Sequence, residues 1–112
     1  MDQARPATFT SPDGAKQMGL TPLTSDECDL CVVVFSLPPN YRGLKHSHPT
    51  DTVYIIRRGQ FLVDGEGTYE VGDIRWVKAG TPYGPEGAGP DGCEVLLIGT
   101  GTFPLLTNQL PA

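Results

Sequence analysis

The chain has 112 residues, a formal net charge of −5, and 14 glycine and 11 proline residues. This length fits one domain with a buried core and leaves no room for a second catalytic domain. The eight basic residues are scattered, which argues against nucleic-acid binding. No apolar stretch is long enough to cross a membrane, and residues 1–15 lack the apolar core of a signal peptide. We therefore expect a soluble, cytoplasmic protein with neither a nucleic-acid nor a membrane partner.

The chain is predicted to begin with a polar leader and to continue in strands. Residues 1–27 form the leader, which could add one edge strand near Met18–Leu23. Later segments are rich in β-branched residues or alternate apolar with polar ones, and they predict strands at 30–37, 52–58, 60–64, 68–71, 74–78 and 93–99. No segment keeps a helical apolar period over three turns.

Glycine and proline make up more than a fifth of the chain, against a usual combined share of about 12%. Pro38-Pro39 ends the first strong strand, Gly59 predicts a tight turn, and Asp64-Gly65 is a hairpin signal. Gly72-Asp73 predicts another turn, and residues 79–92 a loop dense in glycine and proline. About eight short strands with such turns predict an all-β antiparallel sandwich or barrel.

Three cysteines, Cys28, Cys31 and Cys93, make a secreted disulfide framework a poor fit, because their number is odd. Cys28 and Cys31 have the spacing of zinc and redox motifs. They lead directly into a strand, however, where positions i and i+3 face opposite ways, and a redox pair needs a helix N-terminus. We interpret all three as reduced, small buried residues.

His46 and His48 are the only histidines in the chain. On a strand both imidazoles would project from one face, with Cα atoms roughly 7 Å apart. Two imidazoles at that spacing can close on one divalent metal or on one substrate. The simpler interpretation is two polar residues that bond to their neighbours.

Two stretches carry recognisable motifs. Residues 43–59 read GLKHSHPTDTVYIIRRG, with a glycine, His-x-His and a closing glycine; residues 72–83 read GDIRWVKAGTPY, with Gly-Asp followed by a glycine and a short loop. Together they resemble the two motifs of the cupin superfamily. The glycine frame of the family is matched at Gly59, Gly65, Gly72-Asp73 and Gly80. The resemblance implies a small antiparallel double-stranded β-helix, or jelly-roll β-barrel, over residues 28–105, with 106–112 as a tail. It also implies a homodimer and a His-x-His that points into the barrel.

Two of the four usual metal ligands of that family are replaced. The family glutamate falls at Thr52 and the second-motif histidine at Tyr83, while Lys78 stands in place of the motif proline. Asp51 has the wrong strand parity, unless a bulge at Pro49-Thr50 turns it inward. The hypothesis is a two-histidine site at His46 and His48 that could bear one divalent iron, zinc, nickel, copper or manganese ion. Water or an anionic substrate would complete the centre, and whether Asp51 or Tyr83 supplies a third ligand stays open.

The remaining candidate residues would line the same barrel. His46, His48 and Tyr83 are the catalytic candidates, and a buried phenol such as Tyr83 can donate a hydrogen bond or act as a general acid. Substrate-binding candidates are Thr52, Tyr54, Tyr83 and Arg75. Only one of Arg75 and Trp76 can face inward, and an inward arginine would bind a carboxylate or an enolate.

These residues predict an enzyme that acts on a small organic acid, ketone or polyketide-like substrate. A dioxygenase or lyase would need the metal, whereas an isomerase or cyclase could use a histidine as proton shuttle, with Tyr83 as its partner. The alternative is a non-catalytic ligand-binding or sensory cupin module.

Overall fold

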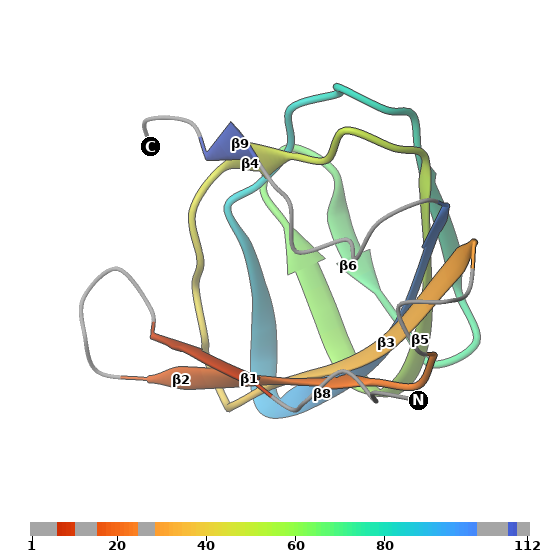
Figure 1. The fold of residues 1–112 in the computed structure, drawn as a ribbon. Helices are drawn as coiled ribbons and strands as arrows, with labels where there is room; N and C mark the ends of the chain where they lie inside the picture. Colours follow the sequence, from red (N-terminus) through yellow and green to blue (C-terminus); the bar gives the residue numbers. More distant parts are fainter. Residues whose placement is uncertain (1–6, 11–15, 25–28, 101–107, 110–112) are drawn as a thin grey trace.

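The computed structural model describes residues 7–10, 16–24, 29–100 and 108–109. Within these ranges the chain forms strands and no helix, so the all-β prediction is confirmed (Figure 1). The strands are β1 (Ala7–Thr10), β2 (Gln17–Pro22), β3 (Leu30–Leu37), β4 (His46–Ser47), β5 (Thr52–Val63), β6 (Gly67–Tyr69), β7 (Ile74–Val77), β8 (Glu86–Thr100) and β9 (Asn108–Gln109). No helix in these ranges could span a membrane.

One antiparallel sheet curves around a common interior, in the order β1-β2-β3-β8-β5-β6, with β7 also paired to β5. β8 is the central strand, because it pairs with β3 along one edge and with β5 along the other. β4 and β9 form a separate two-stranded ribbon at one end of the barrel (Figure 1). The result is a jelly-roll barrel.

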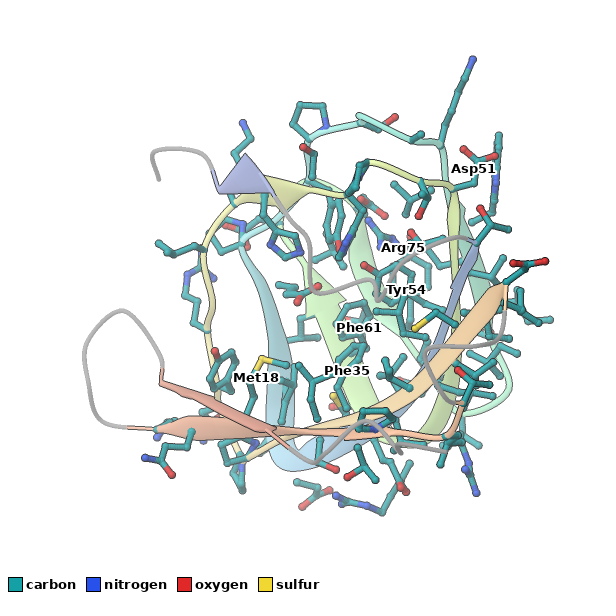
Figure 2. The ribbon with its side chains drawn as sticks, viewed as in Figure 1. Met18, Phe35, Asp51, Tyr54, Phe61 and Arg75 are labelled. Atoms are coloured by element: carbon teal, nitrogen blue, oxygen red, sulfur yellow. The ribbon has the colours of Figure 1, made fainter. Side chains whose placement is uncertain are left out.

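The interior is filled by the inward residues of these strands. On β3, Val33 and Phe35 are buried, as period-two alternation requires. Figure 2 shows Tyr54, Phe61 and Phe35 following one another along the interior, with Arg75 at the end of this series. Their three aromatic rings contact one another with centroids 5.6–6.0 Å apart. This aromatic cluster fills the interior next to Arg75.

The predicted tight turn at Gly59 is wrong, because β5 runs through it from Thr52 to Val63. The register between β5 and β8 shifts on either side of Gly59, so this glycine lies in an irregular stretch of a continuous strand. Its φ is +71°, and a Cβ there would overlap the carbonyl oxygen of Gly92 on β8. The glycine therefore permits a close crossing of two backbones.

The predicted loop over residues 79–92 is also partly wrong, because β8 begins at Glu86. The glycines that indicate a loop instead allow the strand to lie against its neighbours. A Cβ at Gly87 would overlap the carbonyl oxygen of Tyr41, so close packing of backbone, and not turn geometry, explains this glycine.

The remaining strand predictions agree with the structure at 30–37 and 74–77. The stretch before residue 28 contributes two strands, β1 and β2, where the sequence indicates one. The predicted boundaries after residues 27 and 105 lie outside the described residues, as does Cys28. Cys31 and Cys93 are buried, and burial raises the pKa of the Cys93 thiol to about 12, which keeps it protonated at neutral pH.

Candidate active site

The backbone itself brings His46 and Tyr83 together. Each residue donates its N–H to the carbonyl oxygen of the other, at 2.9 Å in both directions. Residues paired in this way across an antiparallel bridge present their side chains on the same side. The two rings accordingly lie with centroids 4.6 Å apart. Tyr83, 37 positions away in sequence, is thus held beside His46 by main-chain geometry.

The Tyr83 hydroxyl is the point on which both imidazoles converge. It lies 2.8 Å from His46 Nε2 and 3.0 Å from His48 Nε2. The Tyr54 hydroxyl bonds to the Tyr83 hydroxyl and also lies 3.3 Å from His48 Nε2. The structure therefore joins four of the predicted residues in one buried hydrogen-bond network, which we call the phenol–imidazole network (His46, His48, Tyr54 and Tyr83).

The direction of the hydrogen bonds follows from a single carbonyl. His46 Nδ1 lies 2.9 Å from the carbonyl oxygen of Leu44, which can only accept, so Nδ1 carries the proton. In neutral His46 the other nitrogen, Nε2, is then an acceptor, and Tyr83 donates its O–H to it. Tyr54 donates in turn to the Tyr83 oxygen. Burial raises the pKa of Tyr54 well above its ordinary value, an effect that the charge of Glu86 reinforces and that of Arg75 opposes, so Tyr54 remains a donor.

Arg75 faces inward and Trp76 faces outward, which settles the choice between them. Arg75 is 5% exposed and stands opposite Tyr54 in the β5–β7 register. Its Nε and Nη2 each donate to a carboxylate oxygen of Glu66 at 2.7 Å. Its guanidinium carbon lies 4.4 Å from the ring centroid of Tyr83 and 4.9 Å from that of Tyr54, within the range of cation–π attraction.

Glu86 is a site residue that the sequence did not indicate. It opens β8, is 8% exposed, and places Oε1 3.9 Å from His46 Nε2. Burial raises the pKa of its carboxyl, although the charges of His46 and Arg75 oppose this. Its other oxygen, Oε2, has no hydrogen-bond partner among the described residues. The loop interpretation of residues 79–92 concealed it.

Thr52 and Asp51 point in opposite directions. Thr52 is fully buried on the same face of β5 as Tyr54. Asp51 is exposed at the rim of the barrel (Figure 2), where its Oδ1 accepts a hydrogen bond from the backbone N–H of Ala79 at 2.7 Å. Asp51 therefore supports the loop before residue 80 and is not a ligand of the interior.

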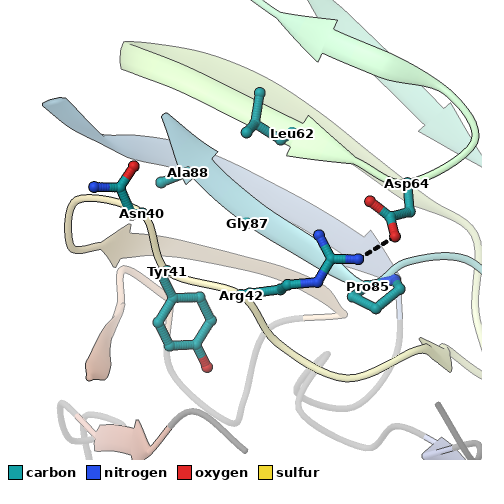
Figure 3. Close-up of a pocket in the computed structure, with 8 residues that line it drawn as sticks. All are labelled: Asn40, Tyr41, Arg42, Leu62, Asp64, Pro85, Gly87 and Ala88. Atoms are coloured by element: carbon teal, nitrogen blue, oxygen red, sulfur yellow. Dashed lines mark hydrogen bonds and ion pairs between the residues drawn. The ribbon is translucent and has the colours of Figure 1, made fainter. Parts of the chain in front are cut away.

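A separate surface hollow of about 240 Å³ lies between the segment after β3, the end of β5 and the start of β8 (Figure 3). It is lined by Asn40, Tyr41, Arg42, Leu62, Asp64, Pro85, Gly87 and Ala88. Its two charged residues, Arg42 and Asp64, form an ion pair with each other. Because they satisfy each other, this hollow offers a ligand fewer unpaired groups than the barrel interior.

Solved structures with the same fold support the resemblance found in the sequence. An RmlC-like cupin from Shewanella frigidimarina superposes with a TM-score of 0.65 at 18% identity, over 85% of this chain and 85% of its own. The fold is that of the cupins. The polyketide cyclase RemF from Streptomyces resistomycificus gives a TM-score of 0.73 at 17% identity, over 100% of this chain and 87% of its own. An acetylacetone dioxygenase from Acinetobacter johnsonii gives 0.67 at 17% identity, over 84% and 68%. The chain matches no protein-family model and no curated protein sequence.

The interior donors do not suit the divalent metal that the cupin fold implies. Among the described residues, no three His, Cys, Asp or Glu side chains are placed to hold a metal ion. The point between the two imidazole nitrogens is taken by the Tyr83 hydroxyl. A guanidinium also lies against the Tyr83 ring, and its charge would oppose a second cation. What the arrangement can do chemically is move protons.

Proposed function

We propose that this cupin barrel catalyses proton transfer on a small carbonyl compound, as an isomerase or cyclase that works without a metal. The observation that carries the proposal is the position of the Tyr83 hydroxyl. It lies within hydrogen-bond distance of Nε2 of His46 and of Nε2 of His48. A hydroxyl already bonded to an imidazole acceptor can release its proton to that imidazole while it takes another from a substrate. The similarity to a polyketide cyclase is consistent with this chemistry.

The proposed cycle moves one proton along Tyr83 and His46. The Tyr83 oxygen takes a proton from the carbon next to the substrate carbonyl, as the Tyr83 proton passes to His46 Nε2. The C–H electron pair becomes the enolate, and His46 becomes an imidazolium, which the Glu86 carboxyl 3.9 Å away stabilises when ionised. Reversal of the proton path onto another carbon gives an isomer. Attack of the enolate carbon on a second carbonyl gives a ring and an alkoxide, which takes the proton back from His46 through Tyr83.

The first test is metal content. Protein purified without an affinity tag is analysed for iron, zinc, nickel, copper and manganese, beside the His46→Ala/His48→Ala double variant. We expect no stoichiometric metal in either protein. A near-stoichiometric metal that is lost from the double variant, and that is needed for turnover, would overturn the metal-free proposal and favour dioxygenase or lyase chemistry at His46 and His48.

The second test follows deuterium uptake from D₂O by NMR, with acetophenone, levulinate and acetylacetone as enolisable probes. We expect the protein to accelerate exchange at the carbon beside the carbonyl, and chelator treatment to leave the rate unchanged. Tyr83→Phe should lower the rate by about 10²-fold or more. Tyr41→Phe, a buried tyrosine outside the phenol–imidazole network, is the matched control. Saturable binding without exchange would favour the non-catalytic ligand-binding module instead.

A further inference from the structure

One nitrogen of the Arg75 guanidinium makes no hydrogen bond to the described residues, although it is buried inside the barrel. The side chain is only 4% exposed, and Nη1 has no hydrogen-bond partner among the described residues. A buried donor left unsatisfied destabilises a fold, and this one carries a formal charge. Such a group in a native interior calls for an explanation, and a ligand oxygen is one.

Arg75 is also held rigidly. Glu66 binds Nε and Nη2 side-on, at 2.7 Å for each bond, and the rings of Tyr54 and Tyr83 lie close to the guanidinium carbon. Rotation of the guanidinium would break both Glu66 bonds. Nη1 is therefore fixed in direction before any ligand arrives, which is the condition for electrostatic preorganisation.

The charges around Arg75 indicate whether the ligand group that Nη1 binds is neutral or anionic. Glu66 already balances the guanidinium, and the Glu86 carboxyl also acts on it through space. A substrate that entered as a carboxylate would add a negative charge beside Glu66 and Glu86, which already act on Arg75. A neutral carbonyl adds none on entry, and its oxygen becomes negative only when the neighbouring carbon loses a proton.

We propose that Arg75 Nη1 is the donor that stabilises an enolate oxygen, and that the substrate is a neutral ketone or diketone and not a carboxylate. Arg75 takes this role only if the reacting group is a carbonyl, as in the function proposed above. Glu66 is then a positioning residue, which acts through Arg75 without contact with the substrate. Placement beside Tyr83 suits this role, because the carbonyl oxygen and the carbon that loses the proton are only two bonds apart.

The test uses 4-nitrophenol, whose phenolate resembles an enolate and absorbs at a different wavelength from the neutral phenol. Its ionisation is titrated optically while it is bound to the 112-residue chain, and no turnover is required. We expect the Arg75 guanidinium to lower the pKa of bound 4-nitrophenol relative to a variant that lacks it. Arg75→Met should raise the pKa of bound 4-nitrophenol by about one to two pH units, since a hydrogen bond to a charged group contributes about 1.5–3 kcal/mol.

Three variants keep the result interpretable. Arg57→Met removes an exposed arginine from β5 and should leave the titration unchanged. Arg75→Lys keeps the charge but lacks the fork, and we expect it to restore only part of the effect. If Arg75→Met fails to fold, the double variant Arg75→Met/Glu66→Ala is used in its place. It removes both partners of the ion pair and so leaves neither charge unpaired.

The outcomes separate this role from the proposed function. An unchanged titration in Arg75→Met, or no saturable binding of 4-nitrophenol, would each overturn the role of Arg75. Tighter binding of acetoacetate than of acetylacetone would overturn the preference for neutral substrates. If Arg75 passes these tests but no probe exchanges deuterium, the proton-transfer function fails, and the barrel is a binding site for oxyanions.

Discussion

The two faces of the β5–β7 pair carry opposite kinds of side chain. Tyr54 and Arg75 face each other on the inner side and are buried, although both are polar. On the outer side Ile74 is 67% exposed and Trp76 62% exposed, although both are apolar. Globular proteins usually show the reverse. A buried polar pair costs stability unless its bonds are made, so ordinary apolar packing does not explain the inner face.

The outer face extends across four neighbouring strands in register. Two rows of apolar residues cross β7, β5, β8 and β3 in order: Trp76, Val53, Ile98 and Val32 in one row, and Ile74, Ile55, Leu96 and Val34 in the other. Exposure is greatest on β7. The contrast between the faces can therefore be tested from both sides with single substitutions in the same strands.

The largest loss of stability is expected when the Glu66 carboxylate, the partner of Arg75, is removed. Glu66→Ala would leave Arg75 buried without its carboxylate, and breaking a buried pair typically costs 3–5 kcal/mol. Because the Glu66 side chain is 34% exposed, water can supply part of the solvation that its carboxylate gives Arg75. We therefore expect the free energy of unfolding to fall by about 2 kcal/mol. Urea unfolding followed by circular dichroism measures it. A loss under about 0.5 kcal/mol would mean that Arg75 does not depend on Glu66.

Removal of both Arg75 and Glu66 should recover most of the stability that Glu66→Ala loses. In Arg75→Met/Glu66→Ala neither charge of the Arg75–Glu66 pair remains, and apolar replacement of an ion pair is often neutral. We expect its free energy of unfolding to lie within about 1 kcal/mol of the parent, while the pKa of bound 4-nitrophenol rises as in Arg75→Met. A double-mutant cycle gives the coupling between the two residues. Additive effects would contradict the pairing.

Glu86→Gln should stabilise the protein at neutral pH. Burial raises the pKa of Glu86 above its ordinary 4.5, so its contribution to stability is present below pH 4.5 and is lost as the pH rises through the raised value. Glu66 has the opposite sign, because hydrogen bonds from Arg75 lower its pKa. We expect Glu86→Gln to gain on the order of 1 kcal/mol at pH 7 and almost nothing at pH 4. Thermal unfolding across pH 4–8 measures the difference, and a constant offset would contradict it.

The smallest effect is expected on the outer face. Trp76→Lys and Ile74→Lys exchange largely exposed side chains, and surface substitutions usually change stability by less than about 0.5 kcal/mol. Unfolding experiments combined with sedimentation would show this together with the oligomeric state. A larger loss, accompanied by a change in sedimentation, would show that a second copy of the chain covers this face in solution.

The sequence predicts the parts of the site that depend on strand parity. Inward positions for Thr52 and Tyr54, with Asp51 outside, follow from period-two alternation once His48 is placed. The choice between Arg75 and Trp76 could not be made this way, because neither residue is a clear inward type. The Glu66 partner that permits Arg75 to be buried comes from the turn between β5 and β6, and its reach depends on turn geometry that parity does not describe.

Glycine caused the main errors, for a physical reason. In a sequence, glycine indicates a turn, yet Gly59 and Gly87 lie in strands where another backbone comes too close for a Cβ. That proximity involves segments far apart in the chain and is visible only after folding. The same errors hid Glu86, since a residue assigned to a loop is not expected to face a barrel interior.

The central place of β8 has a consequence for synthesis. β3 and β5 are complete by residue 63, yet the strand that joins them spans residues 86–100. At a ribosomal rate of about 5–20 residues per second, roughly 2–7 s pass between the end of β5 and the end of β8. During that interval two apolar strands have left or are leaving the ribosome with unpaired edges. The nascent chain is therefore a candidate for chaperone capture in this window.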